Sequence, residues 1–455
     1  MDCGSYAGCI DIDHIKSKVM STKVGVLGAG ISGIGAALLA KAKGNDVFVS
    51  DGGEIASGRK EILIKHNIPF EEKGHTLDML VACDTIIKSP GIANESSIIE
   101  LLRLADKEII GEIEWAFRNA NGKIIGITGS NGKTTTTGLC HHFLRSSGID
   151  AAKVGNVGEG FCDFLSTGSA DWYVCELSSF QLEDVIEFRP DVAVLLNITP
   201  DHLDRYEYNL DKYADAKMMI VKAMTESDLL IYNAMDPITV AKVVSTQIES
   251  RLWTIRETDI IDDNKVYVKD NLILDLSKSR LMGKHNQLNV IAAARAALLA
   301  GCSEEGLQSA LESFVNESHR MELVEEKLGV RYINDSKATN VDAVYYALES
   351  MKTPVIWIAG GLDKGNEYGT IMDLVKNKVR ALICLGLDNT KLYDAFSTEV
   401  YYISETTSVR EAVRRAASLA SEGDTVLLSP ACASFDLFKD YRDRGNQFKE
   451  AVNEL

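Results

Sequence analysis

The stretch that decides the fold is residues 123–137, which read KIIGITGSNGKTTTT. It opens as a short apolar strand, passes through a glycine turn and leads into a predicted helix. A strand, a glycine-rich turn, a Lys-Thr pair and a helix in this order are typical of a P-loop that binds a nucleoside triphosphate. Residue 127 is Ile where the full motif has Gly, so the loop is a shortened variant. We predict that Lys133 reaches the phosphates and that Thr134 binds magnesium.

Upstream of this loop, residues 23–51 read as strand, glycine turn, helix and strand. Gly28, Gly30 and Gly33 have the spacing of a dinucleotide-binding fingerprint, and Asp51 ends the second strand. Such glycines let a phosphate approach the backbone at a helix N-terminus. A lone fingerprint is a weak signal for NAD, because the same glycines can serve only to permit a tight turn between strand and helix.

Downstream of the loop, polar residues follow two more strand-like runs. Glu176 closes the run at 171–177, and His202 follows the run at 191–199 within TPDHLDRY. Carboxylates near a P-loop commonly hold magnesium, and ligands bind at the carboxyl edge of a parallel sheet. Taken alone, a strand-end glutamate is more often a solvated or capping residue, and a lone histidine is usually structural. Lys217 reads as an ordinary helical lysine whose apolar flank, MMIV, could bury its stem.

The remainder of the chain divides into two parts. At 228–282 the runs RLWTI, KVYV and LILDL are joined by acidic turns, which predicts a small antiparallel insertion. From residue 318 strands alternate with helices again, which predicts a mostly parallel sheet. Polar clusters follow three of these strands, at 334–340, 360–364 and 429–436. Three clusters on one sheet edge indicate a site.

Composition sets the class of protein. The chain has 455 residues, 45% of them apolar and 25% charged, which predicts about three globular domains. A net charge of −18 argues against binding of nucleic acid or of an anionic membrane surface. The nine cysteines form no Cys-x-x-Cys pair, which favours free thiols in a reducing compartment. The first twenty residues lack the features of a signal peptide, and no apolar run reaches the ~18 residues of a membrane span. We therefore expect a cytoplasmic protein without membrane insertion.

Several segments together resemble a known family. In order, they are TGSNGKTTTT, ELSSFQLE, NITPDHLDRY, GKHNQLN, SHRMELV, NDSKATN and SPACASFDLFKDYRDRGNQF. This series resembles the Mur ligases of peptidoglycan synthesis, from about residue 23 to the C-terminus. The P-loop, the DHLDRY-type segment and the HNxxN segment are shared with the wider superfamily, which includes folylpolyglutamate synthase. NDSKATN and SPACASFD are more specific and resemble the members that add D-glutamate.

The resemblance implies an α/β fold with three domains. These are a Rossmann-like domain at 1–121 for a uridine nucleotide, a P-loop ATPase at 122–317 with a parallel sheet plus a small antiparallel β portion, and a Rossmann-like domain at 318–455 for an amino acid. It assigns the glycine turn to a uridine diphosphate and not to NAD. It also implies the small-molecule substrates UDP-N-acetylmuramoyl-L-alanine and D-glutamate, together with ATP, two Mg²⁺ ions, a carbamylated Lys217 and a monomeric state.

The family's site residues carry over one by one. For ATP they are Gly129, Asn131, Gly132, Lys133, Thr134, Thr135, Asn286, Asn289, His319, Arg320 and Asp335. For magnesium they are Thr134, Glu176, His202 and the carbamate on Lys217, and the catalytic set is Lys133, His202 and Lys217. For the substrates they are Gly30, Ile31, Ser32, Ser89, Asn156, Lys337, Thr339, Lys364 and Ser434. The implied reaction is ATP-dependent amide formation through an acyl phosphate and a tetrahedral intermediate, with His202 as a candidate base.

The chain also departs from the family pattern, and other functions stay open. Gly52-Gly53 offers no side chain where some relatives have Thr-Arg near the uracil, and Tyr441 stands where Phe is expected. An NAD-dependent oxidoreductase would leave the P-loop and NDSKATN unexplained. A non-catalytic nucleotide sensor would be expected to have lost the lysine, glutamate or histidine of the site. A Mur-type or folylpolyglutamate-type ligase could use another acceptor, such as L-alanine, meso-diaminopimelate or a γ-glutamyl chain.

Overall fold

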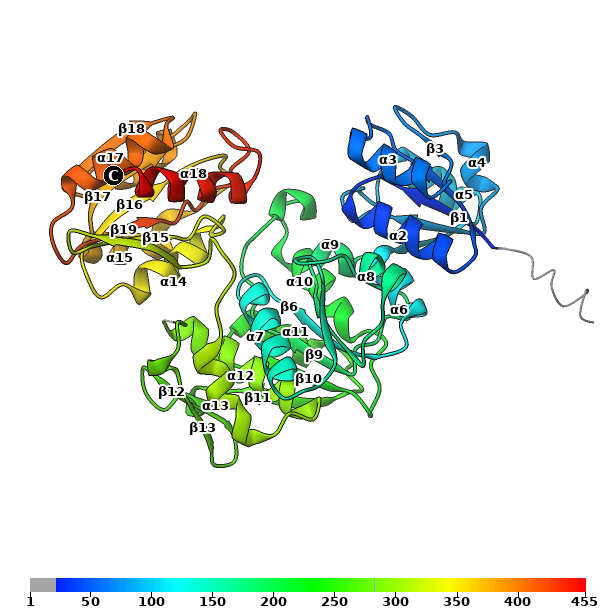
Figure 1. The fold of residues 1–455 in the computed structure, drawn as a ribbon, viewed down its shortest axis with the longest axis horizontal. Coiled ribbons are helices and arrows are strands. Elements are labelled where there is room, and N and C mark those ends of the chain that lie inside the picture. Colours follow the sequence, from blue (N-terminus) through cyan, green and yellow to red (C-terminus); the bar gives the residue numbers. More distant parts are fainter. Residues whose placement is uncertain (1–21, 282) are drawn as a thin grey trace, which may run out of the picture. The chain divides into compact units, whose positions relative to one another are not determined.

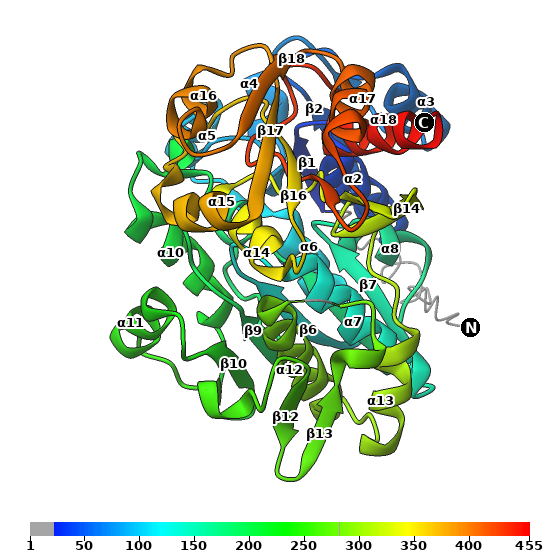
Figure 2. The same cartoon turned by 90° about the vertical axis from the view of Figure 1, so that its left-hand side faces the viewer.

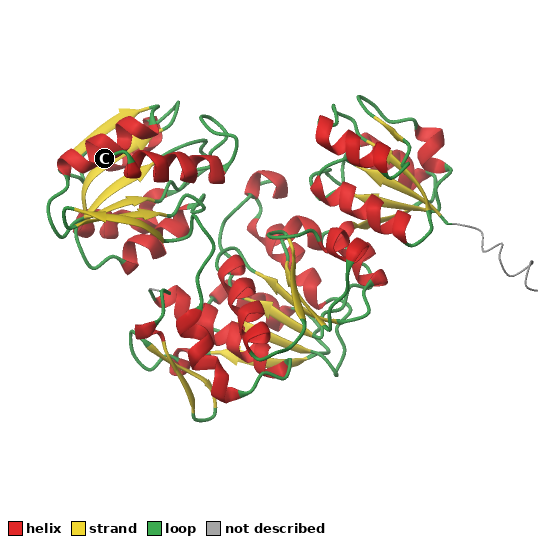
Figure 3. Cartoon of the chain, viewed as in Figure 1, coloured by secondary structure: helices red, strands yellow, loops and turns green. Residues whose placement is uncertain are grey.

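The computed structural model describes residues 22–281 and 283–455 (Figure 1). Cys3, Cys9 and the stretch tested for a signal peptide lie outside these residues. The seven cysteines of the described part are buried free thiols. The described residues form no helix with the length and apolar character needed to traverse a lipid bilayer. Helices pack on both faces of mostly parallel sheets (Figure 3), which confirms the predicted α/β class.

The described residues divide into two compact units, of which the first comprises residues 22–120, 160–169 and 184–186. It contains a parallel sheet in the order β3-β2-β1-β4-β5. The strands are β1 (Lys23–Leu27), β2 (Asp46–Ser50), β3 (Phe70–Glu71), β4 (Thr85–Lys88) and β5 (Glu108–Gly111). The helices are α2 (Ile31–Ala42), α3 (Ser57–Lys65), α4 (Leu77–Val81), α5 (Ser97–Leu104), α6 (Glu112–Asn119) and α8 (Phe161–Thr167). A Cβ at residue 33 would lie 1.8 Å from the Gly28 carbonyl oxygen, so the turn between β1 and α2 requires glycine there.

Helix α8 belongs to this first unit although it follows β7 in the chain. It packs against α2 and α6, and the buried Glu112 carboxylate accepts the Cys162 backbone N–H at 2.7 Å. The short segment at 184–186 is attached in a similar way, because Asp184 pairs with the buried Lys88 at 2.8 Å. Two pieces of later sequence thus complete the unit that carries the glycine turn.

The second unit contains the remaining residues and two large sheets. The first of these sheets is parallel throughout, in the order β11-β10-β9-β6-β8-β7. Its strands are β6 (Lys123–Thr128), β7 (Ala151–Gly155), β8 (Trp172–Glu176), β9 (Val192–Leu195), β10 (Leu229–Asn233) and β11 (Arg251–Ile255). Its helices are α7 (Lys133–Ser146), α9 (Ser179–Leu182), α10 (Leu210–Met218), α11 (Pro237–Ser245), α12 (Lys284–Leu299) and α13 (Glu304–Ser313).

The small antiparallel portion is smaller than predicted. Only β12 (Lys265–Lys269) and β13 (Leu272–Asp275) form an antiparallel pair. The RLWTI run is β11, which pairs parallel with β10, so its assignment to the antiparallel insertion was wrong. Helix α11 provides the crossover between these two parallel strands, as parallel neighbours require.

The third sheet has the order β14-β15-β19-β16-β17-β18, antiparallel only between β14 and β15. Its strands are β14 (Glu322–Lys327), β15 (Val330–Asn334), β16 (Val355–Ala359), β17 (Val379–Leu385), β18 (Tyr402–Thr406) and β19 (Thr425–Leu428). Its helices are α14 (Val341–Ser350), α15 (Met372–Lys378), α16 (Thr390–Phe396), α17 (Val409–Leu419) and α18 (Tyr441–Asn453). Because β19 lies between β15 and β16, the three predicted polar clusters follow adjacent strands. Helix α14 contacts α12 of the preceding sheet (Figure 2).

Candidate active site

The P-loop connects β6 to α7. Gly132 has φ +88°, and a Cβ there would lie 2.4 Å from Asn289 Oδ1, so this position also requires glycine. Lys133 Nζ donates to the Gly129 carbonyl at 2.7 Å and to the Ser130 carbonyl at 2.8 Å. The Lys133 ammonium is therefore bonded to carbonyls of its own loop. A bound phosphate would accept these hydrogen bonds in their place.

Glu176 ends β8, which neighbours β6 in the sheet, and its side chain is buried. Oε1 accepts the Asn156 amide at 3.0 Å, whereas Oε2 is buried with no hydrogen-bond donor among the described residues. Burial would raise the pKa of Glu176, but the charges of Lys337 and Lys133 outweigh it and the pKa is lowered. A buried, ionised carboxylate with a free oxygen suits a hard divalent cation.

His202 and Asp201 follow β9 in the loop that begins α10. Asp201 pairs with Lys364 Nζ at 3.2 Å and accepts the Asn340 amide at 3.2 Å. Burial would raise the pKa of Asp201, but the charges of His202 and Lys364 lower it. His202 has φ +52°, and burial lowers the pKa of its imidazole. A neutral imidazole can bind a metal ion or accept a proton.

Lys217 lies at the end of α10 and is only 1% exposed. Its Nζ donates to the Gly129 carbonyl at 2.9 Å and lies 4.5 Å from the ring centre of Tyr213. Burial, and then the charge of Lys133, lower the pKa of Lys217 well below its ordinary value. The Lys217 ammonium therefore loses its proton more readily than an ordinary lysine. Its burial agrees with the expectation that the apolar flank could bury its stem, whereas the interpretation as an ordinary helical lysine does not predict its contact with the P-loop.

Two cations from the C-terminal part of the chain contact the P-loop. Arg320 Nη2 donates to Thr134 Oγ1 at 2.7 Å, and Lys337 Nζ donates to the same oxygen at 2.9 Å. Burial, followed by the charge of Arg320, lowers the pKa of Lys337 to about 7. Asp335 is buried, accepts Ser429 Oγ at 2.9 Å, and has its pKa raised by burial to about 7.

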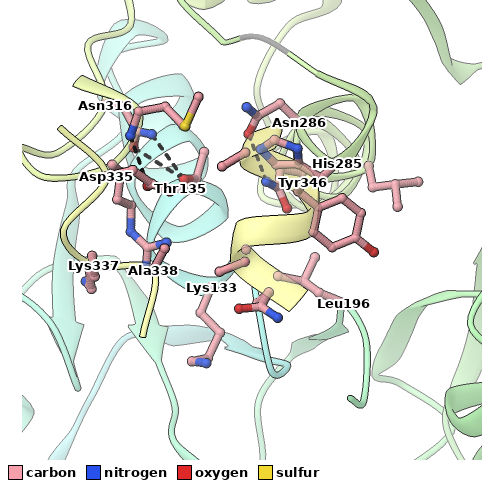
Figure 4. Close-up of a pocket in the computed structure, with 18 of the residues that line it drawn as sticks. Lys133, Thr135, Leu196, His285, Asn286, Asn316, Asp335, Lys337, Ala338 and Tyr346 are labelled. Atoms are coloured by element: carbon pink, nitrogen blue, oxygen red, sulfur yellow. Dashed lines mark hydrogen bonds between the residues drawn. The ribbon is translucent and has the colours of Figure 1, made fainter. Parts of the chain in front are cut away.

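These residues surround one large cavity of about 1500 Å³ (Figure 4). The predicted site residues that line it are Asn131, Gly132, Lys133, Thr135, Asn156, Glu176, His202, Asn286, Asn289, Arg320, Asp335, Lys337 and Thr339. Gly129 and Thr134 lie in the P-loop without lining the cavity. The buried Lys217 does not line it either and is bonded to the Gly129 carbonyl. Lys364 and the buried Ser434 do not line it, and His319 faces Asn334 and Tyr441 instead.

Four predicted substrate residues lie in the first unit. Gly30 precedes α2, and Ile31 and Ser32 begin that helix, with Ile31 70% exposed. Ser89 follows β4 and donates its hydroxyl to the Gly28 carbonyl at 3.1 Å. All four therefore lie at the carboxyl edge of the first sheet, where ligands of open α/β sheets bind.

The sequence analysis missed several residues that line the cavity. The rings of His285 and Tyr346 lie 5.3 Å apart, on the opposite side of the cavity from Asp335 and Lys337 (Figure 4). Asn316 forms a hydrogen bond of 3.3 Å with Thr135 Oγ1. His285 falls within the GKHNQLN segment, which was a signal that could have identified it. Tyr346 and Asn316 lie in no motif.

Comparison with known families accounts for most of the chain. The Mur ligase middle domain matches residues 127–297, the Mur ligase glutamate ligase domain matches 319–432, and the MurD N-terminal domain matches 23–98. Curated relatives named UDP-N-acetylmuramoylalanine–D-glutamate ligase align over nearly the full length. The one from Christiangramia forsetii is 43% identical and covers 96% of this chain and 100% of its own. The one from Porphyromonas gingivalis W83 is 47% identical, with 94% and 98% covered.

Solved structures share the fold. A pseudomurein peptide ligase type C from Methanothermus fervidus superposes with a TM-score of 0.60 at 20% identity, covering 95% of this chain and 100% of that one. The UDP-N-acetylmuramate-alanine ligase MurC from Thermotoga maritima also has a TM-score of 0.60 at 20% identity, with 95% and 99% covered. MurF ligase from Thermotoga maritima, solved in complex with ADP, has a TM-score of 0.58 at 17% identity, with 83% and 91% covered.

Proposed function

The chain belongs to the Mur ligase family, and from that premise we propose that it joins D-glutamate to UDP-N-acetylmuramoyl-L-alanine at the expense of ATP. The observation that carries the proposal is the contact of Thr134 in the P-loop with Arg320 and Lys337. Residues from two sheets thereby meet at one cavity beside the buried Glu176. Such a cavity can bring a nucleoside triphosphate and an acceptor amine together.

The reaction needs an activated acyl group because a carboxylate is a poor acyl donor. The terminal alanine carboxylate attacks the γ-phosphorus of ATP, the bond to ADP breaks, and an acyl phosphate forms. The amine of D-glutamate then attacks the carbonyl carbon, and the tetrahedral intermediate expels phosphate. In this scheme Lys133 turns from its own loop carbonyls to the phosphates and offsets their charge.

The polar groups beside the P-loop fit magnesium. Thr134 Oγ1, the free Glu176 Oε2 and the His202 imidazole would hold the two Mg²⁺ ions that we propose, and the ions would neutralise charge on the phosphates. Lys217 would contribute once carbamylated. Its neutral Nζ adds to the carbon of carbon dioxide and loses a proton, which leaves an anionic carbamate with two hard oxygen ligands. The depressed pKa of Lys217 supports this step because only the free amine is nucleophilic.

The acceptor would be bound by the loops of the third sheet. Lys337, Thr339, Lys364 and Ser434 follow its adjacent strands, and a dicarboxylate amino acid needs cationic and hydroxyl donors. Lys364 now pairs with Asp201, so an incoming carboxylate would compete with that residue. His202 is the candidate base for the amine proton, and because a neutral imidazole has one available lone pair, it takes this role only when it does not hold magnesium.

The test is phosphate release from ATP with UDP-N-acetylmuramoyl-L-alanine and a panel of D-glutamate, L-alanine, D-alanine and meso-diaminopimelate. We expect release and peptide formation with D-glutamate alone. Lys133→Ala should abolish both, whereas Lys123→Ala, which changes an exposed lysine ten residues away, should not. Lys364→Ala should raise the KM for D-glutamate far more than the KM for ATP. Equal use of another amino acid on the panel would contradict the assigned acceptor.

A further inference from the structure

The loop that carries His202 has a disfavoured backbone conformation at both ends. Its short 3-10 helix, η1 (Leu203–Tyr206), lies between His202, with φ +52°, and Glu207, with φ +54°. Both angles fall in the left-handed region, which residues with a side chain rarely adopt and which persists only where the surrounding structure holds it. Contacts with other elements must therefore keep this loop in its conformation.

Glu183, which follows α9, binds η1 at two points. Its Oε1 accepts the Tyr206 hydroxyl at 2.6 Å, and its Oε2 accepts a hydrogen bond from Arg205 Nη2 at 2.8 Å. Burial, followed by the hydrogen bond to Glu183, raises the pKa of Tyr206, so the hydroxyl keeps the proton that it donates. Helix α9 itself begins with a capping box between Ser178 and Gln181. One carboxylate thus ties η1 to a helix whose start is fixed.

The guanidinium of Arg205 also packs on Phe180 of α9. Its central carbon lies 4.4 Å from the centre of the Phe180 ring, which is a cation–π contact. The Phe180 ring in turn meets the His202 imidazole edge to face, with ring centres 5.2 Å apart and an interplanar angle of 71°. Asp201 Oδ2 lies 3.7 Å from His202 Nε2, which is longer than a hydrogen bond, so Asp201 does not fix the plane of the imidazole. Phe180, held by Arg205, is the contact that does.

The hydrogen bond between Glu183 and Tyr206 leads to a different part of the site. The Tyr206 ring lies 5.4 Å from the ring of Tyr213, and Lys217 Nζ lies 4.5 Å from the centre of that second ring. Removing Glu183 would therefore disturb the surroundings of Lys217 as well. Removing the guanidinium of Arg205 leaves this second series of contacts in place, so a change at Arg205 isolates the effect on the imidazole.

We propose that Arg205 is a positioning residue for His202, because it holds Phe180 against the imidazole and so sets where that ring meets magnesium or the amine proton. The inference rests on the proposed function, which gives His202 its role. Residues that orient a metal ligand from one contact away commonly change metal affinity or activity by about 10- to 100-fold. If Arg205 only stabilised the contact between α9 and η1, its loss would lower stability and leave the imidazole where it is.

The first test is NMR of the full-length chain labelled with ¹³C and ¹⁵N at histidine, with the His202 resonances assigned by their loss in His202→Ala. Arg205→Met keeps an unbranched stem and removes the charge, and it should shift the imidazole resonances because the Phe180 ring is released. Arg205→Lys keeps a cation for both partners of the arginine and should restore the wild-type resonances. Arg145→Met removes an exposed arginine of another ion pair and should leave the His202 resonances unchanged.

The second test is phosphate release with UDP-N-acetylmuramoyl-L-alanine and D-glutamate. Arg205→Met should lower kcat by about 10- to 100-fold and leave the KM for ATP unchanged, and Arg205→Lys should recover most of the loss. Unchanged His202 resonances in Arg205→Met, or an unchanged kcat, would overturn the inference while leaving the ligase assignment standing. If the wild-type chain released no phosphate in response to D-glutamate, the proposed function would be overturned instead, and the role given to His202 with it.

Discussion

The Lys217 side chain is buried, donates a hydrogen bond to the neutral Gly129 carbonyl, and lies near the charge of Lys133. We predict that Lys217→Ala is inactive, because it removes the carbamate we propose as a magnesium ligand, and that acetate or formate partly restores activity. Protein prepared with ¹³C-bicarbonate should show a carbamate carbon resonance that the variant lacks. Lys212→Ala changes a half-exposed lysine of the same helix, and this variant should keep both the activity and the carbamate carbon resonance. Full activity of Lys217→Ala would contradict the prediction.

Asp335 gives a prediction about pH. Its pKa in the folded chain is about 7 because of burial, whereas an unfolded aspartate titrates near ~4. Between these values the native state holds a proton that the unfolded state has lost, so this group's contribution to stability falls as pH rises through that window. Asp335→Asn should remove this loss and be more stable than wild type at pH 8, by at most about 4 kcal/mol.

Urea unfolding of both proteins from pH 5 to pH 8 measures this difference, since groups common to both cancel. The gap between variant and wild type should widen with pH and level off above pH 7. A gap independent of pH would mean that Asp335 titrates normally. The variant should also bind ATP more weakly, because we propose Asp335 as an ATP contact.

The positions of single site residues were predictable only where a local pattern marks them. Glu176 and His202 end strand-like runs, and parallel strands place such ends on one edge. The apolar flank of Lys217 indicated that its stem could be buried. Its hydrogen bond to Gly129, 88 residues earlier in the chain, depends on tertiary packing that no local pattern encodes. Tyr346 reaches the cavity only because α14 contacts α12. The hydrophobic periodicity of the sequence marks each helix by itself and does not predict a contact between two helices.

Among the elements, helix α8 carries the clearest stability prediction. Phe161 at its start is fully buried within the first unit, although the helix is joined to strands of the second. Phe161→Ala should lower the free energy of unfolding by about 3–5 kcal/mol, as expected for a large buried aromatic side chain. Denaturant unfolding followed by far-ultraviolet circular dichroism measures it. Phe164→Ala in the same helix, at a partly buried position, should cost less.

The sequence predicted whether a segment is a strand more reliably than it predicted which strand lies beside it in the sheet. The runs at β6, β8 and β9 are mostly apolar and almost entirely buried, which is typical of strands covered on both faces. β11 is more polar and largely exposed at the sheet edge, so it resembled a hairpin strand. Its parallel pairing depends on the crossover helix α11, which the sequence analysis did not separate from the neighbouring β-type runs.

At the scale of the molecule, two sheets of the second unit line one cavity, and polar contacts join them. One contact lies in the connecting segment, where Glu317 Oε1 pairs with Lys153 Nζ of β7 at 2.7 Å. Glu317 Oε2 lies 4.0 Å from Lys337 Nζ, so the same carboxylate reaches a cavity residue of the third domain. Glu317 could therefore hold the domains together, position Lys337, or do both.

Exchanging the charges of Lys153 and Glu317 distinguishes the domain contact from the positioning of Lys337. Glu317→Gln and Lys153→Met should each shift the nucleotide-free chain toward more extended conformations in small-angle X-ray scattering. The change should be roughly fivefold in population, because a partly exposed ion pair contributes about 1 kcal/mol. The double variant Lys153→Glu/Glu317→Lys re-forms the pair and should restore the compact profile, yet it places a cation beside Lys337. We therefore expect the KM of the double variant for D-glutamate to be higher than that of wild type, although its scattering profile returns to that of wild type. Restoration of both would assign Glu317 to the domain contact alone, and restoration of neither would mean that the pair does not hold the domains.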